Sequence, residues 1–143
     1  MAIDRVIIGT KLSVINTDPV LSVTNLATST INFIVDGGGS VIVAGSKGFL
    51  VVDYACTILN NTLIADKSGS IVVDIKKINY ATFPTTVSIC AAAKPTLSTA
   101  QKSQDTTLTG WTTAIAAGDI LEYNVDSATT VTRVTLSLKV TKS

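Results

Sequence analysis

The chain contains no histidine, which removes the side chain on which much familiar chemistry depends. Histidine is the commonest general base near neutral pH and a frequent zinc ligand, so the usual catalytic triads and most zinc sites require it. The carboxylates are scattered over separate predicted strands and turns: Asp53, Asp66, Asp74, Asp119, Glu122 and Asp126. Their spacing supports neither a carboxylate pair for glycoside hydrolysis nor a calcium-binding loop. We therefore predict a protein that is not an enzyme, with no catalytic residue, no cofactor and no metal ion.

Two short motifs resemble known sites but have simpler explanations. The run Gly37-Gly38-Gly39-Ser40 lacks the spacing of a phosphate-binding loop, since Gly45-Ser46-Lys47 does not supply the Gly-Lys-Ser/Thr ending and no helix is predicted to follow. We predict a hairpin turn there. Asn60-Asn61-Thr62 matches the glycosylation sequon, but the N-terminus shows no signal peptide, so we expect the sequon to be idle.

Two cysteines, Cys56 and Cys90, lie far apart in the sequence among apolar or small residues. Two scattered positions make no disulfide framework, and a free cysteine behaves as a small apolar residue. We predict two buried free thiols, with a disulfide between neighbouring strands as the alternative.

A sugar-binding face needs exposed aromatic rings, and three residues are candidates for such a ligand face: Tyr80, Phe83 and Trp111. Tyrosine, phenylalanine and tryptophan also serve as core or loop-anchoring residues. That structural role is the alternative for each of the three.

The clearest structural signal is the alternation of apolar and polar residues near the C-terminus. Apolar residues occupy every second position of the runs 134–140 and 121–125, which predicts strands with one dry and one wet face. The connection 126–130 is rich in turn formers. We therefore predict a β-hairpin over residues 120–142.

The rest of the chain also predicts short strands, and no helix, because apolar residues nowhere recur at helical spacing. The further predicted strands are 31–35, 41–43, 49–54, 57–65, 71–75 and 87–90. Turns are predicted at 37–39 and 66–69, and a long polar connection at 96–105. We expect an all-β fold: a two-sheet antiparallel β-sandwich, jelly-roll-like, with an extended N-terminal arm.

Residues 1–29 differ from the sandwich domain predicted for residues 30–143, because they hold short apolar pieces broken by glycine and by a polar turn. Such an arm satisfies its backbone by adding strands to a neighbouring subunit. The alternative is that it packs on its own domain as edge strands. The residues predicted to bind a partner are Val6, Ile7, Ile8, Leu12, Val14, Ile15, Val20 and Leu21.

Charge argues against nucleic acid and membrane partners. The formal net charge is +1, charged residues make up 15% of the chain, and no run of lysine or arginine forms a basic patch. The apolar run 6–8 is too short for a signal-peptide core or a membrane span. We expect the chain to stay where it is synthesised unless another component carries it.

Four motifs together resemble a β-sandwich domain that recurs in bacteriophage and prophage virion proteins, often at the ends of tail-fibre-like chains. They are VDGGGS at 35–40, ADKSGSIVVDI at 65–75, KPTLSTAQK at 94–102 and the run from Asn124 to Lys142. The similarity covers residues 30–143. Relatives often carry aromatic residues near positions 61 and 76, where this chain has Asn61 and Lys76. If those aromatics form a ligand platform, it is damaged here.

The resemblance, together with a free-standing domain and an arm, implies a capsid decoration or cement protein of the virion. Such a protein would be a homo-oligomer, expected to be a trimer, bound to the major capsid protein or other virion proteins and assembled in the host cytoplasm. The alternative is a tail-fibre or receptor-binding tip module that recognises a host surface glycan or protein. A hydrolytic enzyme is the third and weakest hypothesis.

Overall fold

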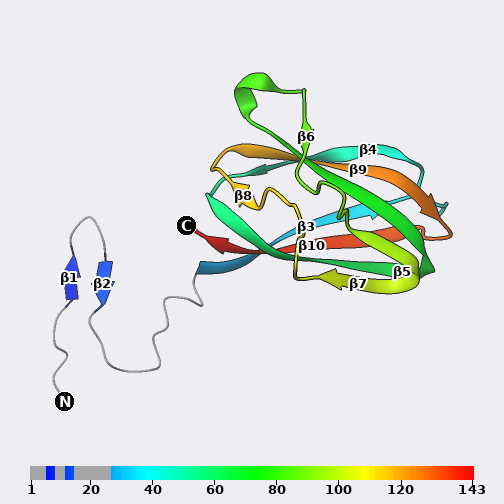
Figure 1. Cartoon of the computed structure of the whole chain (residues 1–143), viewed down its shortest axis with the longest axis horizontal. Helices are drawn as coiled ribbons and strands as arrows, with labels where there is room; N and C mark the ends of the chain where they lie inside the picture. The colour runs from blue at the N-terminus through cyan, green and yellow to red at the C-terminus, as the bar shows by residue number, and fades with distance from the viewer. Residues whose placement is uncertain (1–5, 9–11, 15–26) are drawn as a thin grey trace, which may run out of the picture.

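The computed structural model describes residues 6–8, 12–14 and 27–143 (Figure 1). Its strands are β1 (Val6–Ile8), β2 (Leu12–Val14), β3 (Thr28–Asp36), β4 (Gly45–Val52), β5 (Cys56–Ile78), β6 (Val87–Ser88), β7 (Thr96–Asp105), β8 (Ala114–Ile115), β9 (Asp119–Thr129) and β10 (Arg133–Lys142). A 3-10 turn, η1, spans Tyr80–Thr82. The predicted all-β class is confirmed.

The body is one curled antiparallel sheet of eight strands, with the path β3-β10-β5-β9-β4 and with β6, β7 and β8 paired to β5. Strand β5 is 23 residues long and holds the sheet together. Its first half pairs with β10, its second half pairs with β9, and β7 pairs with both halves. Because β5 bends back between its two halves, β9 and β10 run in opposite directions and the sheet curls around a core (Figure 1).

Strand β5 does not stop at the turn predicted for residues 66–69. The turn formers instead mark the place where one long strand changes its partner from β10 to β9, with a register shift against β7 between Ile64 and Gly69. Gly69 is required there because a Cβ atom would lie 2.6 Å from the carbonyl oxygen of Thr129. The polar sequence therefore lies at a sharp bend inside β5, beyond which the second half of the strand runs back (Figure 1).

The predicted hairpin over residues 120–142 is wrong. Both strands exist, but β9 pairs with β4 and β5, and β10 pairs with β3 and β5, so neither pairs with the other. The connection includes Thr130 at φ 73°, in the left-handed region, and redirects the chain from one half of β5 to the other. Alternation identified the strands but carried no information about their partners.

Two further strand predictions need correction. Residues 96–105 form the ten-residue strand β7, not a connection, and they are polar because β7 pairs only with β5 and keeps one edge and most side chains in water. Residues 41–43 lie in the loop before β4 and form no strand. There Ile42 is buried, and its N–H donates to the carbonyl oxygen of Val131, while Val41 and Val43 are exposed.

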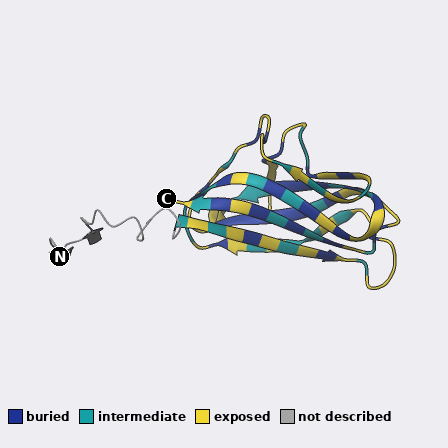
Figure 2. Cartoon of the chain, turned by 90° about the horizontal axis from the view of Figure 1, so that it is seen from below, coloured by how far each residue is buried: buried dark blue, intermediate teal, exposed yellow. Residues whose placement is uncertain are grey.

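The core consists of the inward-facing residues of the long strands, and Figure 2 shows buried and exposed positions alternating along them. Leu136 and Leu138 of β10, with Ile71 of β5, are fully buried. Each such side chain contributes about 1.5–3 kcal/mol relative to an exposed one. The ring of Phe33 on β3 stacks on Tyr123 of β9, with centroids 4.1 Å apart. Strands β3 and β9, which do not pair with each other, are therefore in contact through side chains inside the curled sheet.

Tyr123→Phe is expected to stabilise the fold by about 1 kcal/mol, because the buried Tyr123 hydroxyl has no hydrogen-bond partner among the described residues. Burial also raises the pKa of that hydroxyl. Urea unfolding followed by fluorescence measures the change. Tyr54→Phe is the matched control, since Tyr54 is only partly buried and should change little. Equal stability of the Tyr123→Phe variant and the parent would contradict the expectation.

Asp66→Asn is expected to lower the melting temperature at neutral pH. The Asp66 carboxylate accepts hydrogen bonds from the Thr132 hydroxyl and from the N–H groups of Arg133 and Thr132, at 3.0 and 3.1 Å. The Thr132 hydroxyl, followed by the Arg133 N–H, lowers the pKa of Asp66 to about 2. A carboxyl with a lowered pKa contributes stability that is present above its ordinary pKa of 3.8 and is lost as the pH falls toward 2.

The difference in melting temperature between the parent and Asp66→Asn should therefore shrink between pH 4 and pH 2, which calorimetry at a series of pH values measures. Asp53→Asn is the control, because Asp53 is exposed and forms no hydrogen bond or ion pair in the described part of the chain. A difference that stays constant with pH would show that the charge of Asp66 is not involved.

Candidate functional site

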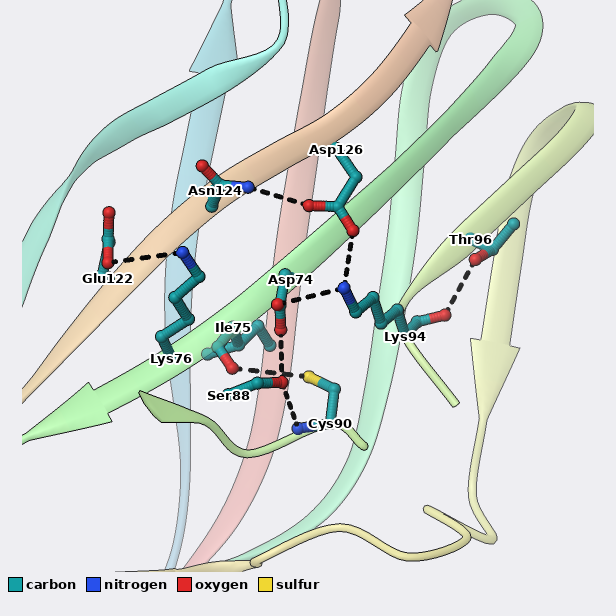
Figure 3. Close-up of polar contacts among 10 residues, drawn as sticks. All are labelled: Asp74, Ile75, Lys76, Ser88, Cys90, Lys94, Thr96, Glu122, Asn124 and Asp126. Atoms are coloured by element: carbon teal, nitrogen blue, oxygen red, sulfur yellow. Dashed lines mark hydrogen bonds and ion pairs between the residues drawn. The ribbon is translucent and has the colours of Figure 1, made fainter. Parts of the chain in front are cut away.

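Acidic residues that are scattered in the sequence come together on one face of β5 and β9 (Figure 3). Asp74 lies on β5 and Asp126 on β9, and Lys94 reaches both from the segment between β6 and β7. The Lys94 Nζ atom is 3.1 Å from Asp74 Oδ2 and 2.7 Å from Asp126 Oδ2. The Asn124 amide donates to the other Asp126 oxygen at 2.8 Å. One lysine thus neutralises two carboxylates and fastens its segment to the sheet.

The same network includes the buried thiol of Cys90. The Ser88 hydroxyl donates to Asp74 Oδ1 at 2.6 Å and accepts from the Cys90 N–H at 3.3 Å, while the Cys90 thiol donates to the Ile75 carbonyl oxygen (Figure 3). Burial raises the pKa of Cys90 to about 12 and also raises that of Cys56. Both thiols are buried and unpaired, as predicted, and both are protonated at neutral pH.

Glu122 on β9 extends the network toward β4. Burial by itself would raise the pKa of Glu122, but hydrogen bonds from Thr86 and Ser46 and the charge of Lys76 outweigh it, so the pKa lies below its usual value. The Lys76 Nζ atom is 3.9 Å from Glu122 Oε2. Asp74, Asp126 and Glu122 thus each have a lysine ammonium within 4 Å, and among the described residues no group of three or more His, Cys, Asp or Glu could hold a metal ion. The arrangement suits a structural clamp.

The clamp holds the segment 79–95, and this segment presents aromatic rings. The ring of Phe83 packs edge-on against Phe49 of β4, with centroids 5.2 Å apart and planes at 73°. Tyr80 is 84% exposed, and the side chain of Asn79 caps its turn by accepting from the N–H and the hydroxyl of Thr82. We call Phe49, Tyr80 and Phe83 the aromatic surface.

Of the three predicted ligand-face residues, Tyr80 and Phe83 are exposed and Trp111 is not. Trp111 is buried, and its indole N–H donates to the carbonyl oxygen of Ala93 at 2.8 Å, so it anchors a loop and offers no ring face to a ligand. Phe49 was missed. The alternation of β4 places Phe49 with Val51 on the wet face, and this signal was available in the sequence.

A groove lies between the two outermost strands of the sheet path. Strands β3 and β4 each pair on one side only, with β10 and β9. The groove has a volume of about 290 Å³ and is lined by Thr30, Ile31 and Asn32 of β3 and by residues 50–54. We call it the edge groove. Along the lining residues, no strand of the described part of the chain pairs with either edge, so both are sites for pairing with a further extended chain.

The two ends of the edge groove are well defined. At one end the Phe33 ring lies against β4, where a Cβ atom on Gly48 would be only 3.3 Å from Phe33 Cζ. At the other end Tyr54 lines the groove, and the Lys142 Nζ atom lies 4.8 Å from the centroid of the Tyr54 ring. The open part of the β3 edge is therefore about as long as a three-residue strand.

The predicted arm residues are only partly described. Val6, Ile7 and Ile8 form β1, and Leu12 and Val14 lie in β2, which pairs antiparallel with β1 so that Val6 is opposite Val14. Ile15, Val20 and Leu21 lie outside the described residues. Strand β3 begins at Thr28, close to the predicted boundary at 29/30. No helix of the described residues is long and apolar enough to cross a membrane.

No protein-family model matches the chain, and no curated protein sequence matches it either. The resemblance to phage virion domains therefore rests on the four sequence motifs alone.

Proposed function

We propose that this protein is a structural component of a bacteriophage virion, of the capsid decoration or cement class. Its N-terminal segment would bridge subunits of the major capsid protein or of other virion proteins. The observation that carries the proposal is that β1 and β2 pair with each other and take no place in the eight-stranded sheet. A two-stranded ribbon of three-residue strands is marginal by itself, so it needs a further surface. A protein that binds only the assembled shell stabilises that shell by mass action.

The body supports a scaffold role under the same proposal. We propose that the curled sheet forms a jelly-roll-like sandwich, with β3, β10 and the first half of β5 opposite β4, β9 and the second half. The stacked rings of Phe33 and Tyr123 support contact between these layers. The row formed by Ile34, Thr135 and Ile64 crosses three paired strands, and its two isoleucines are exposed. A flat, uncharged row of this kind suits contact between subunits of the proposed trimer.

The test is to count copies on purified virions and to delete residues 1–26, which spares β3. A decoration protein is present in hundreds of copies, whereas a fibre protein is present in a dozen or so. The deletion variant should remain folded by circular dichroism and lose binding to undecorated shells. Undiminished shell binding by the folded deletion variant would refute the bridging role of the segment.

A second candidate is a receptor-binding or tail-fibre tip module that recognises a host surface glycan or protein. The aromatic surface favours it, since exposed rings such as Tyr80 are a usual means of holding a sugar or an apolar partner. Position 61, where relatives often have an aromatic residue, is 1% exposed and so contributes nothing to a surface platform in this chain. Tyr80→Ala with Phe83→Ala should abolish binding to host cells under this alternative and leave shell binding intact under the first.

A further inference from the structure

We infer that the edge groove receives the β1–β2 ribbon of a second copy of this protein, so that copies are joined by exchange of their N-terminal segments. The inference rests on the binding role proposed for that segment and adds the site that receives it. Two features each lack a pairing strand among the residues that the structure describes, and each could supply the strand that the other needs.

The first feature is the edge of β3 from Thr30 onward. The strand pairs with β10 without a register shift, and this part carries no proline, no bulge and no charge before Asp36. Natural sheets protect edges of this kind with lysine, proline, bulges or short strands. Strand β4 has such protection in its first part, where Lys47 lies in a bulge between Ser46 and Gly48, but none from Phe49 to Val52. The unprotected parts of both edges line the edge groove.

The second feature is the β1–β2 ribbon. Its two strands are extended and apolar in sequence, and each is three residues long. This length matches the open part of the β3 edge, from Thr30 to Asn32, which contributes to the groove. The groove volume of about 290 Å³ corresponds to roughly ten water molecules, so it takes a few side chains and not a folded domain.

The choice of a second copy follows from connectivity. Residues 15–27 join β2 to β3, and thirteen residues span at most about 45 Å. This reach exceeds the radius of gyration of roughly 13 Å expected for a body of this size, so the segment can reach a neighbouring copy. Among the described strands, β1 and β2 pair only with each other, although the groove of the same chain is within reach. Exchange lets every copy fill one groove and have its own groove filled.

The experiment measures the oligomeric state of the full chain by sedimentation velocity over a range of concentrations, with no virion component present. Val51→Lys places a charge in the edge groove at an exposed position, and Val87→Lys is the matched control outside the groove. The two side chains are 54% and 67% exposed, so both variants should fold. We expect the parent and Val87→Lys to associate equally, and Val51→Lys to weaken association at least tenfold.

A second variant tests the ribbon itself. Ile7→Asp with Leu12→Asp should abolish association without unfolding the body, whose core lies in residues 31–140. Hydrogen exchange should show the amides of residues 30–32 that face away from β10 protected in the parent at high concentration and unprotected in this variant.

Three results would overturn the inference. The first is a parent that stays monomeric at every concentration, and the second is an oligomer that Val51→Lys leaves intact. The third is a monomer in which Val51→Lys exposes the amides of residues 12–14, because this result would show that the ribbon pairs with the groove of its own chain. These results distinguish failure of the segment exchange from failure of the proposed decoration role. A strictly monomeric parent that still binds shells through its N-terminal segment would overturn the exchange and leave the decoration role standing.

Discussion

Gly69→Ala is expected to destabilise the protein by about 3 kcal/mol, the upper end of the usual cost of overpacking. An added Cβ atom would lie 2.6 Å from the Thr129 carbonyl oxygen, 2.8 Å from Val131 Cγ1 and 3.1 Å from Thr130 Cβ. The first contact is with backbone, which cannot rotate away. Gly69 lies at the bend of β5, so moving the backbone there would disturb the pairing of β5 with both β7 and β9.

Gly39→Ala is the matched control for this prediction. Gly39 has φ 86° and no atom within 4 Å of an added Cβ, so alanine there meets only the left-handed backbone penalty of about 1–2 kcal/mol. Urea unfolding of both variants separates a steric clash from a conformational cost. If Gly69→Ala loses no more stability than Gly39→Ala, the close approach at the bend is not what makes glycine necessary.

Lys94→Met is expected to lower the free energy of unfolding by about 2–3 kcal/mol. Removal of one partner of a buried ion pair costs about 3–5 kcal/mol because it leaves the other charge unpaired in a dry site. Asp74 meets this condition, since its side chain is only 7% exposed, whereas Asp126 is 33% exposed and regains water. The hydrogen bond from Ser88 to Asp74 persists in the variant and reduces the loss.

The double variant Asp74→Asn with Lys94→Met should recover part of the lost stability, because no buried charge is then unpaired. Arg133→Met is the control, since Arg133 and Asp36 form an exposed pair, with side chains 63% and 42% exposed, and such pairs are worth roughly 0–1 kcal/mol. Additive losses in the double variant would show that Lys94 and Asp74 do not interact.

The stability difference between the parent and the Lys94→Met variant should depend on pH in a defined direction. Hydrogen bonds from the Lys94 ammonium to Asp126 and then to Asp74 raise the pKa of Lys94 above its usual value of 10.5. A lysine with a raised pKa contributes stability that is present below pH 10.5 and is lost as the pH rises through the higher folded value. The deficit of the variant should therefore stay constant from pH 7 to pH 10 and shrink only above that range.

The candidate site shows why residue spacing alone was insufficient. Asp74 and Asp126 lie on different strands with no motif between them, and Lys94 lies in a segment without any strong pattern. They meet because β5 pairs with β9 and the segment 79–95 folds back over both. A charge network of this kind depends on strand order, and local sequence does not encode strand order.

The edge groove has the same origin. The pattern of Thr28–Asp36 and that of Gly45–Val52 identify two strands, but nothing in either pattern says that both are outermost. Their position follows from β5, which takes β9 and β10 as partners along its two halves and leaves β3 and β4 at the two ends of the path.

The sequence by itself determined that the chain is all-β and that β9 and β10 are strands, because burial and pleat impose a local two-residue period. It favoured buried free thiols over a disulfide, and the structure decided between them. It also predicted a turn at Asp66–Gly69. Tertiary structure alone decided that this place is a bend inside β5, that β9 and β10 separate instead of pairing, and that the polar residues 96–105 form a strand. The reason is physical: side-chain alternation records which face is dry, whereas strand partners are chosen by contacts between residues far apart in the chain.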